Sequence, residues 1–105
     1  LHQRILILCE GQTELQYAKA IKESIPRTQQ RGFEIDIFRP KRNDPKSLVN
    51  EAKRRQKIAK TGKNAYDDIW LFFDNDNHPK ISEAFRLIEK EKFQFLLFRN
   101  RFTSF

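Results

Sequence analysis

Apolar and polar residues follow two periods along this chain, one typical of strands and the other of helices. Nearly continuous apolar runs at residues 5–9, 68–73 and 93–98 are typical of strands buried on both faces of a parallel sheet. Residues 33–39 instead alternate apolar with acidic positions, which predicts a half-exposed strand. The sequence therefore predicts four strands, and it places the alternating one at an edge of the sheet.

The segments between the strands show helical spacing. A capping box of Thr13 and Gln16 predicts the start of the first helix. Asp44 as N-cap and Pro45 at the first helical position predict the start of the second, which ends near a Thr-Gly pair. The third follows the i, i+3, i+4, i+7 rule with Ile81, Ala84, Phe85 and Ile88. We predict one α/β domain, residues 1–105, folded as a three-layer α/β/α sandwich with a four-stranded, mainly parallel sheet.

Acidic residues directly follow two of the apolar runs. Glu10 follows the run at residues 5–9, and Asp74 and Asp76 follow the run at residues 68–73. Open parallel sheets bind ligands beyond the carboxyl ends of their strands, so these carboxylates are expected to meet at one edge. Two negative charges about 4 Å apart repel by roughly 4 kcal/mol near a protein surface, and a bound cation removes this repulsion. Oxygen ligands suit Mg²⁺ or Mn²⁺, which predicts a metal site; the alternative is a polar turn in which Asp76 or Asn77 caps the third helix.

The continuity of the apolar runs also predicts the strand order. The first and third strands are the most continuously apolar, so we expect them to be central neighbours, with the alternating second strand outside them. Glu10 and Asp74 would then lie close together, with Asp76 on the same rim. The basic face of the second helix is expected to flank an outer strand.

Basic residues are concentrated in the second helix and its flanks. The net charge is +7, and residues 39–63 contain ten basic residues and two acidic ones. Such a block suits the phosphate backbone of DNA or RNA, because neutralising phosphates releases counterions. The candidate nucleic-acid contacts are Arg42, Lys46, Lys53, Arg54 and Lys57. An ordinary solvated helix face explains the same charge run.

Of three further residues near the acidic motifs, Glu14 and His78 have both a functional and a structural interpretation, and Cys9 has a structural one. Glu14 and His78 are candidates to support the metal ligands without touching the metal, although Glu14 also suits the positive end of the helix dipole and His78 a solvated turn. Cys9 is most simply a small core residue.

Composition narrows the class of protein. The single cysteine excludes an internal disulfide, and no apolar run approaches the roughly 18 residues of a membrane span. No Walker A loop is present, so nucleotide hydrolysis by this chain is not expected. We expect a cytoplasmic protein without a membrane partner, and its oligomeric state is left open.

Two motifs resemble a known family. Residues 9–14 (CEGQTE) and 70–79 (WLFFDNDNHP), in this order and spacing, resemble the RloB-like family of bacterial abortive-infection proteins, which act in phage defence. The similarity extends over about residues 5–98. RloB-like chains normally continue after the fourth strand with an aromatic-Glu-aromatic segment and further helices, so the domain is expected to be incomplete at its carboxyl terminus.

The resemblance implies a fold and a chemistry. It implies a Toprim-type domain, in which a Glu after the first strand and an Asp-x-Asp after a later one bind magnesium and act on phosphodiesters. By motif, Glu10 would be a general acid/base or metal ligand, and Asp74 and Asp76 would be metal ligands. The family is usually encoded beside an AAA-type ATPase, which is the implied partner.

Three functions remain open from the sequence. The first is a metal-dependent phosphodiesterase or nuclease effector of phage defence. The second is a truncated, catalytically inert module that binds a partner ATPase or nucleic acid, with Phe98, Phe102 and Phe105 as an exposed aromatic tail. The third, with less support, is a phosphatase-like domain that uses Asp74 as nucleophile.

Overall fold

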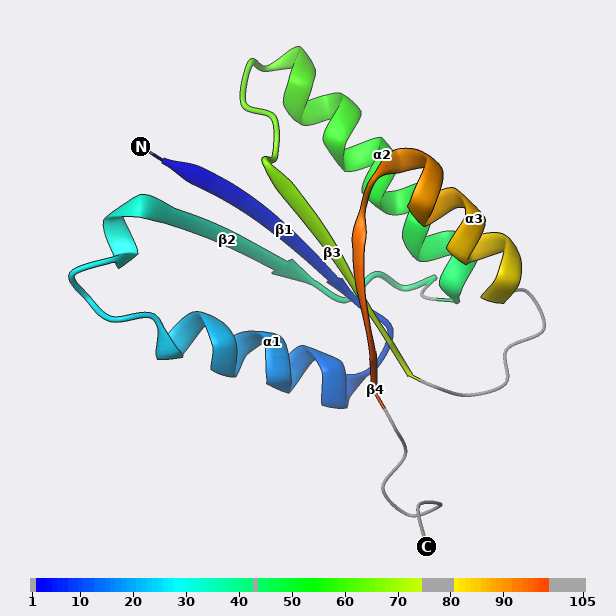
Figure 1. Ribbon diagram of the computed structural model, residues 1–105, viewed down its shortest axis with the longest axis horizontal. Helices are drawn as coiled ribbons and strands as arrows, with labels where there is room; N and C mark the ends of the chain where they lie inside the picture. The colour runs from blue at the N-terminus through cyan, green and yellow to red at the C-terminus, as the bar shows by residue number, and fades with distance from the viewer. Residues whose placement is uncertain (1, 43, 75–80, 99–105) are drawn as a thin grey trace, which may run out of the picture.

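Strands and helices alternate from one end of the chain to the other (Figure 1). The computed structural model describes residues 2–42, 44–74 and 81–98. The elements are β1 (Gln3–Cys9), α1 (Gln12–Ser24), the short 3-10 helix η1 (Gln30–Gly32), β2 (Phe33–Phe38), α2 (Pro45–Thr61), β3 (Asp68–Asp74), α3 (Ile81–Glu91) and β4 (Gln94–Phe98). Each predicted strand and helix is present, and η1 is an addition that the sequence pattern did not indicate.

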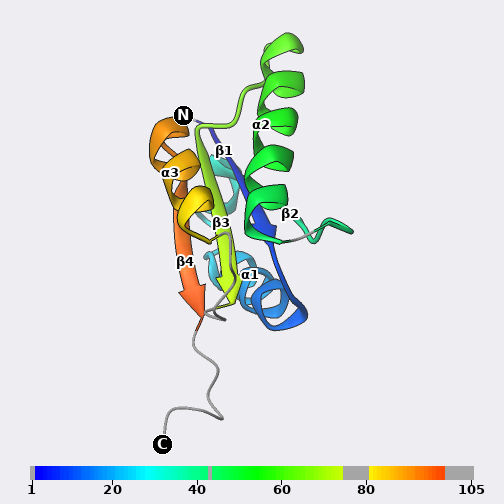
Figure 2. The same ribbon diagram turned by 90° about the vertical axis from the view of Figure 1, so that its right-hand side faces the viewer.

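The described strands form one sheet in the order β2-β1-β3-β4, and every neighbouring pair is parallel. β1 and β3 are therefore the central strands, and the alternating strand β2 is an edge strand, as predicted. Helix α1 covers one face of the sheet, and α2 and α3 cover the other (Figures 1 and 2). The three-layer α/β/α sandwich is confirmed.

Alternating side chains of the central strands build two separate cores. Leu6, Leu8, Leu71 and Phe73 face α2 and α3, where they pack against a stripe of buried residues on α2, Leu48, Val49 and Ala52. Ile7, Cys9 and Phe72 face α1, where they pack against Ala18 and Ile35. Both faces of β1 and β3 are thus buried, which explains why their sequences are continuously apolar.

Capping residues predicted the starts of two helices, and the structure confirms one of these predictions and contradicts the other. Asp44 caps α2 as predicted, with its Oδ2 accepting a hydrogen bond from the Ser47 N–H at 3.2 Å, and Pro45 follows at the first helical position. The capping box predicted at Thr13 is wrong, because α1 begins at Gln12 with Gly11 as its N-cap. The carboxyl group of Glu14 lies against Gly11. A side chain at position 11 would bring its Cβ to 3.0 Å from the Glu14 Oε1. The backbone of Gly11 is extended, a conformation open to any residue, so a larger side chain here would be limited by its contact with the Glu14 carboxyl group.

None of the helices in the described part of the chain is long and apolar enough to cross a membrane.

Candidate active site at the carboxyl edge of the sheet

Glu10 and Asp74 lie at the ends of adjacent parallel strands. Cys9 of β1 is in register with Phe72 of β3, and the backbone N–H of Glu10 extends this pairing by donating to the Phe72 carbonyl at 2.9 Å. Asp74, the last residue of β3, follows two positions after Phe72. Because β1 and β3 are adjacent parallel strands, the prediction that Glu10 and Asp74 follow or end neighbouring strands at the same, carboxyl edge of the sheet is confirmed. Asp76 and His78 lie outside the described residues.

The side chains of both acidic residues are partly buried. Glu10 is half-buried, and its Oε2 is shielded from solvent. Asp74 is half-buried as well, and it stands in register with Phe98 of β4. Charges in such surroundings interact more strongly than at the open surface, since less water screens them.

Glu14 adds a third carboxyl group to this edge. It is the buried acidic residue of α1, with 3% of its surface exposed. Burial raises the pKa of the Glu14 carboxyl, and the nearby charge of Asp74 raises it further. Hydrogen bonds from the N–H groups of Glu14 and Gly11 and the charge of Arg39 act in the opposite direction. The sequence left open whether Glu14 supports the metal ligands or only balances the helix dipole, and the structure buries Glu14 within the electrostatic influence of Asp74.

Cys9 lies beneath these carboxyl groups and is fully buried, as expected of a core residue. Burial, followed by the charge of Glu14, raises the pKa of its thiol to about 12.

We expect Cys9 to resist thiol reagents while the protein is folded. At pH 8 a thiol with a pKa of about 12 is almost entirely protonated, and the buried sulfur is out of reach of a disulfide reagent. Reaction with dithiobis(nitrobenzoate) should be slow in buffer and fast in urea, with Cys9→Ser as the blank. Fast modification of the folded protein would contradict this burial.

The donor set at this edge consists of carboxylate oxygens, which are the ligands that Mg²⁺ and Mn²⁺ prefer. Within residues 2–42, 44–74 and 81–98, no three acidic, histidine or cysteine side chains are grouped closely enough to hold one metal ion. Of the three predicted metal ligands, two, Glu10 and Asp74, are among the described residues. The third, Asp76, belongs to residues 75–80.

The predicted nucleic-acid contacts are partly engaged in ion pairs. Lys46 Nζ lies 3.6 Å from Glu83, and Lys53 Nζ lies 3.4 Å from Glu91, so both lysines point from α2 toward α3. On the other side of α2, Arg54 and Arg55 both reach Glu51 at 2.7 Å. Arg42 and Lys57 line surface pockets on opposite sides of α2. The basic block is therefore divided between two sides of the helix.

Glu51 organises the arginines on its side of α2. Hydrogen bonds from Arg54 and Arg55, and the charges of both, lower the pKa of the Glu51 carboxyl to about 2, against an ordinary value of about 4.3. A carboxyl with a lowered pKa stabilises the fold above the ordinary value, and this contribution is lost as the pH falls toward 2.

We expect Glu51→Gln to lower the free energy of unfolding at pH 7 by about 1 kcal/mol, a value reduced for solvent screening because Arg54 is largely exposed. The difference from the unsubstituted protein should shrink as the pH is lowered from 5 toward 2. Urea unfolding at several pH values measures this, with Glu89→Gln on the exposed surface of α3 as control. A difference that does not change with pH would show that ionisation of Glu51 is not involved.

A second polar cluster was missed by the sequence interpretation. Arg4 of β1 is in register with Glu34 of β2, and its Nε donates to the Glu34 carboxylate at 2.8 Å. Asp36 accepts from Arg4 Nη2 at 3.4 Å and from the Tyr66 hydroxyl at 2.8 Å. The alternating acidic residues of β2 were visible in the sequence. Their partners, Arg4 and Tyr66, are 30 to 32 residues away in the chain and become neighbours only in the folded sheet.

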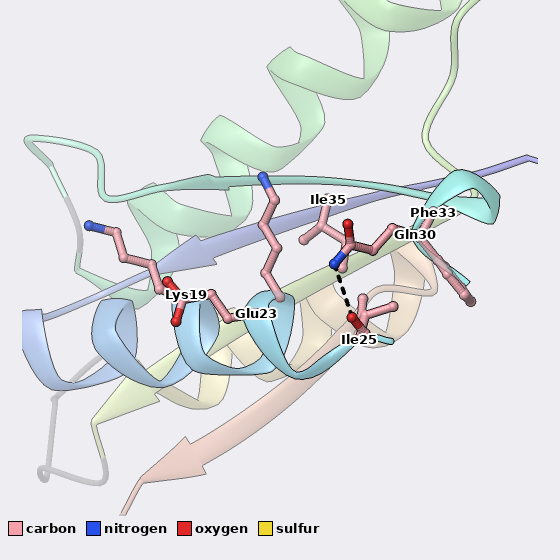
Figure 3. A pocket seen from close by; sticks show the side chains of 7 residues that line it. Lys19, Glu23, Ile25, Gln30, Phe33 and Ile35 are labelled. Carbon is pink, nitrogen blue, oxygen red and sulfur yellow. Dashed lines mark hydrogen bonds between the residues drawn. The ribbon is translucent and has the colours of Figure 1, made fainter. Parts of the chain in front are cut away.

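A separate pocket of about 500 Å³ lies between α1 and the start of β2 (Figure 3). Gln30 closes one side of it by donating from Nε2 to the Ile25 carbonyl at 3.1 Å. Phe33, the first residue of β2, lies in its lining, so the pocket belongs to the end of the sheet opposite the carboxylates. We do not assign it to the active site.

The expectation of an exposed aromatic tail needs a correction at Phe98. Its ring packs against Tyr17 and Phe72, with centroid distances of 5.1 and 5.5 Å. Phe102 and Phe105 lie outside the described residues. On β4 the exposed apolar residues are instead Phe95 and Leu97, at 43% and 37%.

The architecture and the site define a class: a parallel α/β/α sandwich with acidic residues of β1, β3 and α1 at its carboxyl edge, where open sheets of this kind bind ligands. Within this class the chain belongs to the RloB-like family, whose model, described as RloB-like protein, matches residues 5–102. Comparisons with curated proteins and with solved structures gave no significant match.

Proposed function

We propose that this protein is a metal-dependent phosphodiesterase, acting as a nuclease in bacterial phage defence. The observation that supports it best is the placement of Glu10 and Asp74 on adjacent parallel strands at the carboxyl edge. Carboxylates at the ends of adjacent strands repel each other, and a cation bound between them would reduce this repulsion. Membership of the RloB-like family agrees with a defence role.

The donor set fits a hard divalent cation. Glu10, Asp74 and Asp76 would hold Mg²⁺ or Mn²⁺, which when bound activates water and stabilises the charge that develops on a phosphodiester. Glu10 is suited to general acid/base work as well, since its half-buried carboxylate stands beside the position that such a substrate would occupy. Glu14 orients the start of α1 over this edge through its contact with Gly11.

A phosphodiester needs positive charge beside these acids, and the chain supplies it on the neighbouring connection. Arg39 directly follows β2 and lies close enough to affect the pKa of Glu14. Lys41 and Arg42 continue this connection toward α2. Together with the basic residues of α2, they would hold a DNA or RNA backbone while Glu10 and Asp74 face the scissile bond.

The test is incubation of the purified protein with single-stranded and duplex DNA and with RNA, in Mg²⁺, in Mn²⁺ and in EDTA. Cleavage is expected with either metal and not in EDTA. Cleavage that continues unchanged in EDTA would contradict a metal-dependent reaction. Binding without cleavage in any metal would favour the inert binding module instead.

An AAA-type ATPase is the proposed partner in the cell. Co-expression with an AAA-type ATPase of the kind usually encoded beside this family, followed by affinity purification, tests the association. Phe95 and Leu97 are the described apolar residues of β4 that such a partner could cover.

A further inference from the structure

The edge strand β2 extends beyond the helix layer on the α2 side of the sheet. Helix α2 packs over β1 and β3, as its contacts and both overall views show (Figures 1 and 2). The face of β2 that carries Glu34, Asp36 and Phe38 is consequently not buried in the α2 core, whose described members come from β1, β3, α2 and α3. A concave strip remains between α2 and β2.

Two pockets of about 480 Å³ each lie along this strip and have Arg54 and Arg55 in common. One contains Pro40, Lys41 and Arg42, which follow β2 at the carboxyl edge. The other reaches Arg4 and Tyr66 at the opposite edge, where the strands begin. We call the combined feature the α2–β2 trough. Since the pockets share two residues, they lie next to each other along α2, one toward each edge of the sheet.

The lining of the trough combines cations with aromatic rings. Among the described residues that line the two pockets, Arg4, Lys41, Arg42, Arg54 and Arg55 are basic and Glu51 is acidic. The Arg55 guanidinium stacks 3.9 Å above the centre of the Phe38 ring, and that of Arg4 stacks 4.4 Å from the centre of the Tyr66 ring. Phe38 borders the trough through this contact with Arg55, and it is 37% exposed. Glu34 and Asp36, on the same face of β2, accept hydrogen bonds from Arg4, so the positive charge of the trough is concentrated toward Lys41 and Arg42. Planar cations and aromatic rings beside such charge are the elements that hold nucleic-acid bases and backbone.

We propose that the α2–β2 trough binds a single-stranded polynucleotide and leads it to the carboxylates at the edge of the sheet. This proposal rests on the proposed function, and it adds a location and a substrate class. A single strand suits the trough because its unstacked bases can reach Phe38 and the guanidinium planes, whereas the base faces of a duplex are covered by their neighbours. The strand would leave the trough past Lys41 and Arg42, on the connection that begins with Arg39 beside Glu14.

The dimensions agree with a short segment of strand. From Ser47 to Gly62, the α2 wall of the trough is about 22 Å long at about 1.5 Å per helical residue. A few nucleotides of an extended single strand fit that length.

The other side of α2 is a less suitable place for the strand. A pocket of about 800 Å³ there is lined by Lys53, Lys57, Lys60 and Phe93. Phe93 directly precedes β4, so this pocket opens at the edge of the sheet where the strands begin, away from Glu10 and Asp74. Arg54 borders this pocket as well, but its other basic residues are lysines, which provide charge without a planar stacking surface.

Binding is measured by fluorescence anisotropy in EDTA, so that cleavage does not interfere. The probes are labelled oligothymidine and oligouridine of about 12 nucleotides, which distinguish DNA from RNA, and a duplex of the same length. Lys41→Ala combined with Arg42→Ala should weaken single-strand binding at least about tenfold and lower its salt slope by about 1.4. The matched control on α1, which covers the opposite face of the sheet, is Lys19→Ala with Lys22→Ala; it removes two exposed positive charges and should change the affinity less than about twofold.

Variants at Phe38 distinguish the contribution of base stacking to binding from the contribution of charge. Phe38→Leu should weaken binding about tenfold with the salt slope unchanged, and Phe38→Tyr should keep the original affinity, because it keeps the ring.

The proposal is overturned if the protein does not bind the single strands, if it binds the duplex equally well, or if the two double variants lose affinity equally. These outcomes are distinct from failure of the nuclease proposal. Loss of binding in EDTA concerns the trough alone, whereas absence of metal-dependent cleavage by a protein that still binds concerns the carboxylates.

Discussion

Asp74→Asn is expected to reduce metal-dependent cleavage at least about a thousandfold while leaving the fold and the binding of nucleic acid in place. The substitution keeps the size of the side chain and removes the negative charge that would attract the cation, and a loss of about 4 kcal/mol of transition-state stabilisation corresponds to that factor. Asp74 is half-buried at the end of β3, beside Glu10 and near Glu14. Initial cleavage rates over a range of Mn²⁺ concentrations measure the effect.

The chain offers a matched control on the same strand. Asp68 is the first residue of β3 and is exposed, at the edge of the sheet opposite Asp74. Asp68→Asn makes the same chemical change, so its cleavage rate should stay within about twofold of the original protein. Equal activity of the two variants would show that charge at the carboxyl edge does not drive the reaction. A thermal unfolding scan of both excludes misfolding as the cause of lost activity.

Phe73→Ala is expected to have the largest effect on stability. Phe73 is fully buried in the core between the sheet and the α2–α3 layer, where its ring lies 6.5 Å from that of Phe85. Removing a buried phenylalanine ring leaves a cavity and costs about 3–5 kcal/mol, which is a large part of the roughly 5–15 kcal/mol that stabilises a typical domain. We expect the variant to unfold at much lower urea concentration, or to be partly unfolded in buffer.

Two comparison variants make this result specific. Phe73→Leu refills most of the space and should cost clearly less than the alanine variant. Phe95→Ala removes the same ring from a position that is 43% exposed, so about 1 kcal/mol or less is expected. Urea unfolding followed by the fluorescence of Trp70, the single tryptophan, provides the free energies. Similar losses at positions 73 and 95 would contradict the assignment of Phe73 to the core.

Much of the fold could be predicted because its signals are local. Asp44 and Pro45 mark the start of α2 within a few residues, and the cap forms through a hydrogen bond to the nearby Ser47. The start of α1 was misassigned at Thr13 because the N-cap residue is Gly11, which has no side chain to form a recognisable capping motif. The carboxylate pair followed from the same local information, since residues at the carboxyl ends of adjacent parallel strands share an edge.

The sequence by itself determined the alternation of strands and helices, the central position of β1 and β3, and the meeting of Glu10 and Asp74 at one edge. These features follow from apolar periodicity, which records how many faces of each element are buried. Only the tertiary structure decided that Glu14 is buried beside Asp74, that Arg4 joins Glu34, Asp36 and Tyr66, and that α2 divides its basic residues between two sides. The reason is physical: such contacts depend on strand register and on where a helix sits over the sheet, and neither is encoded in the spacing of residues along one element.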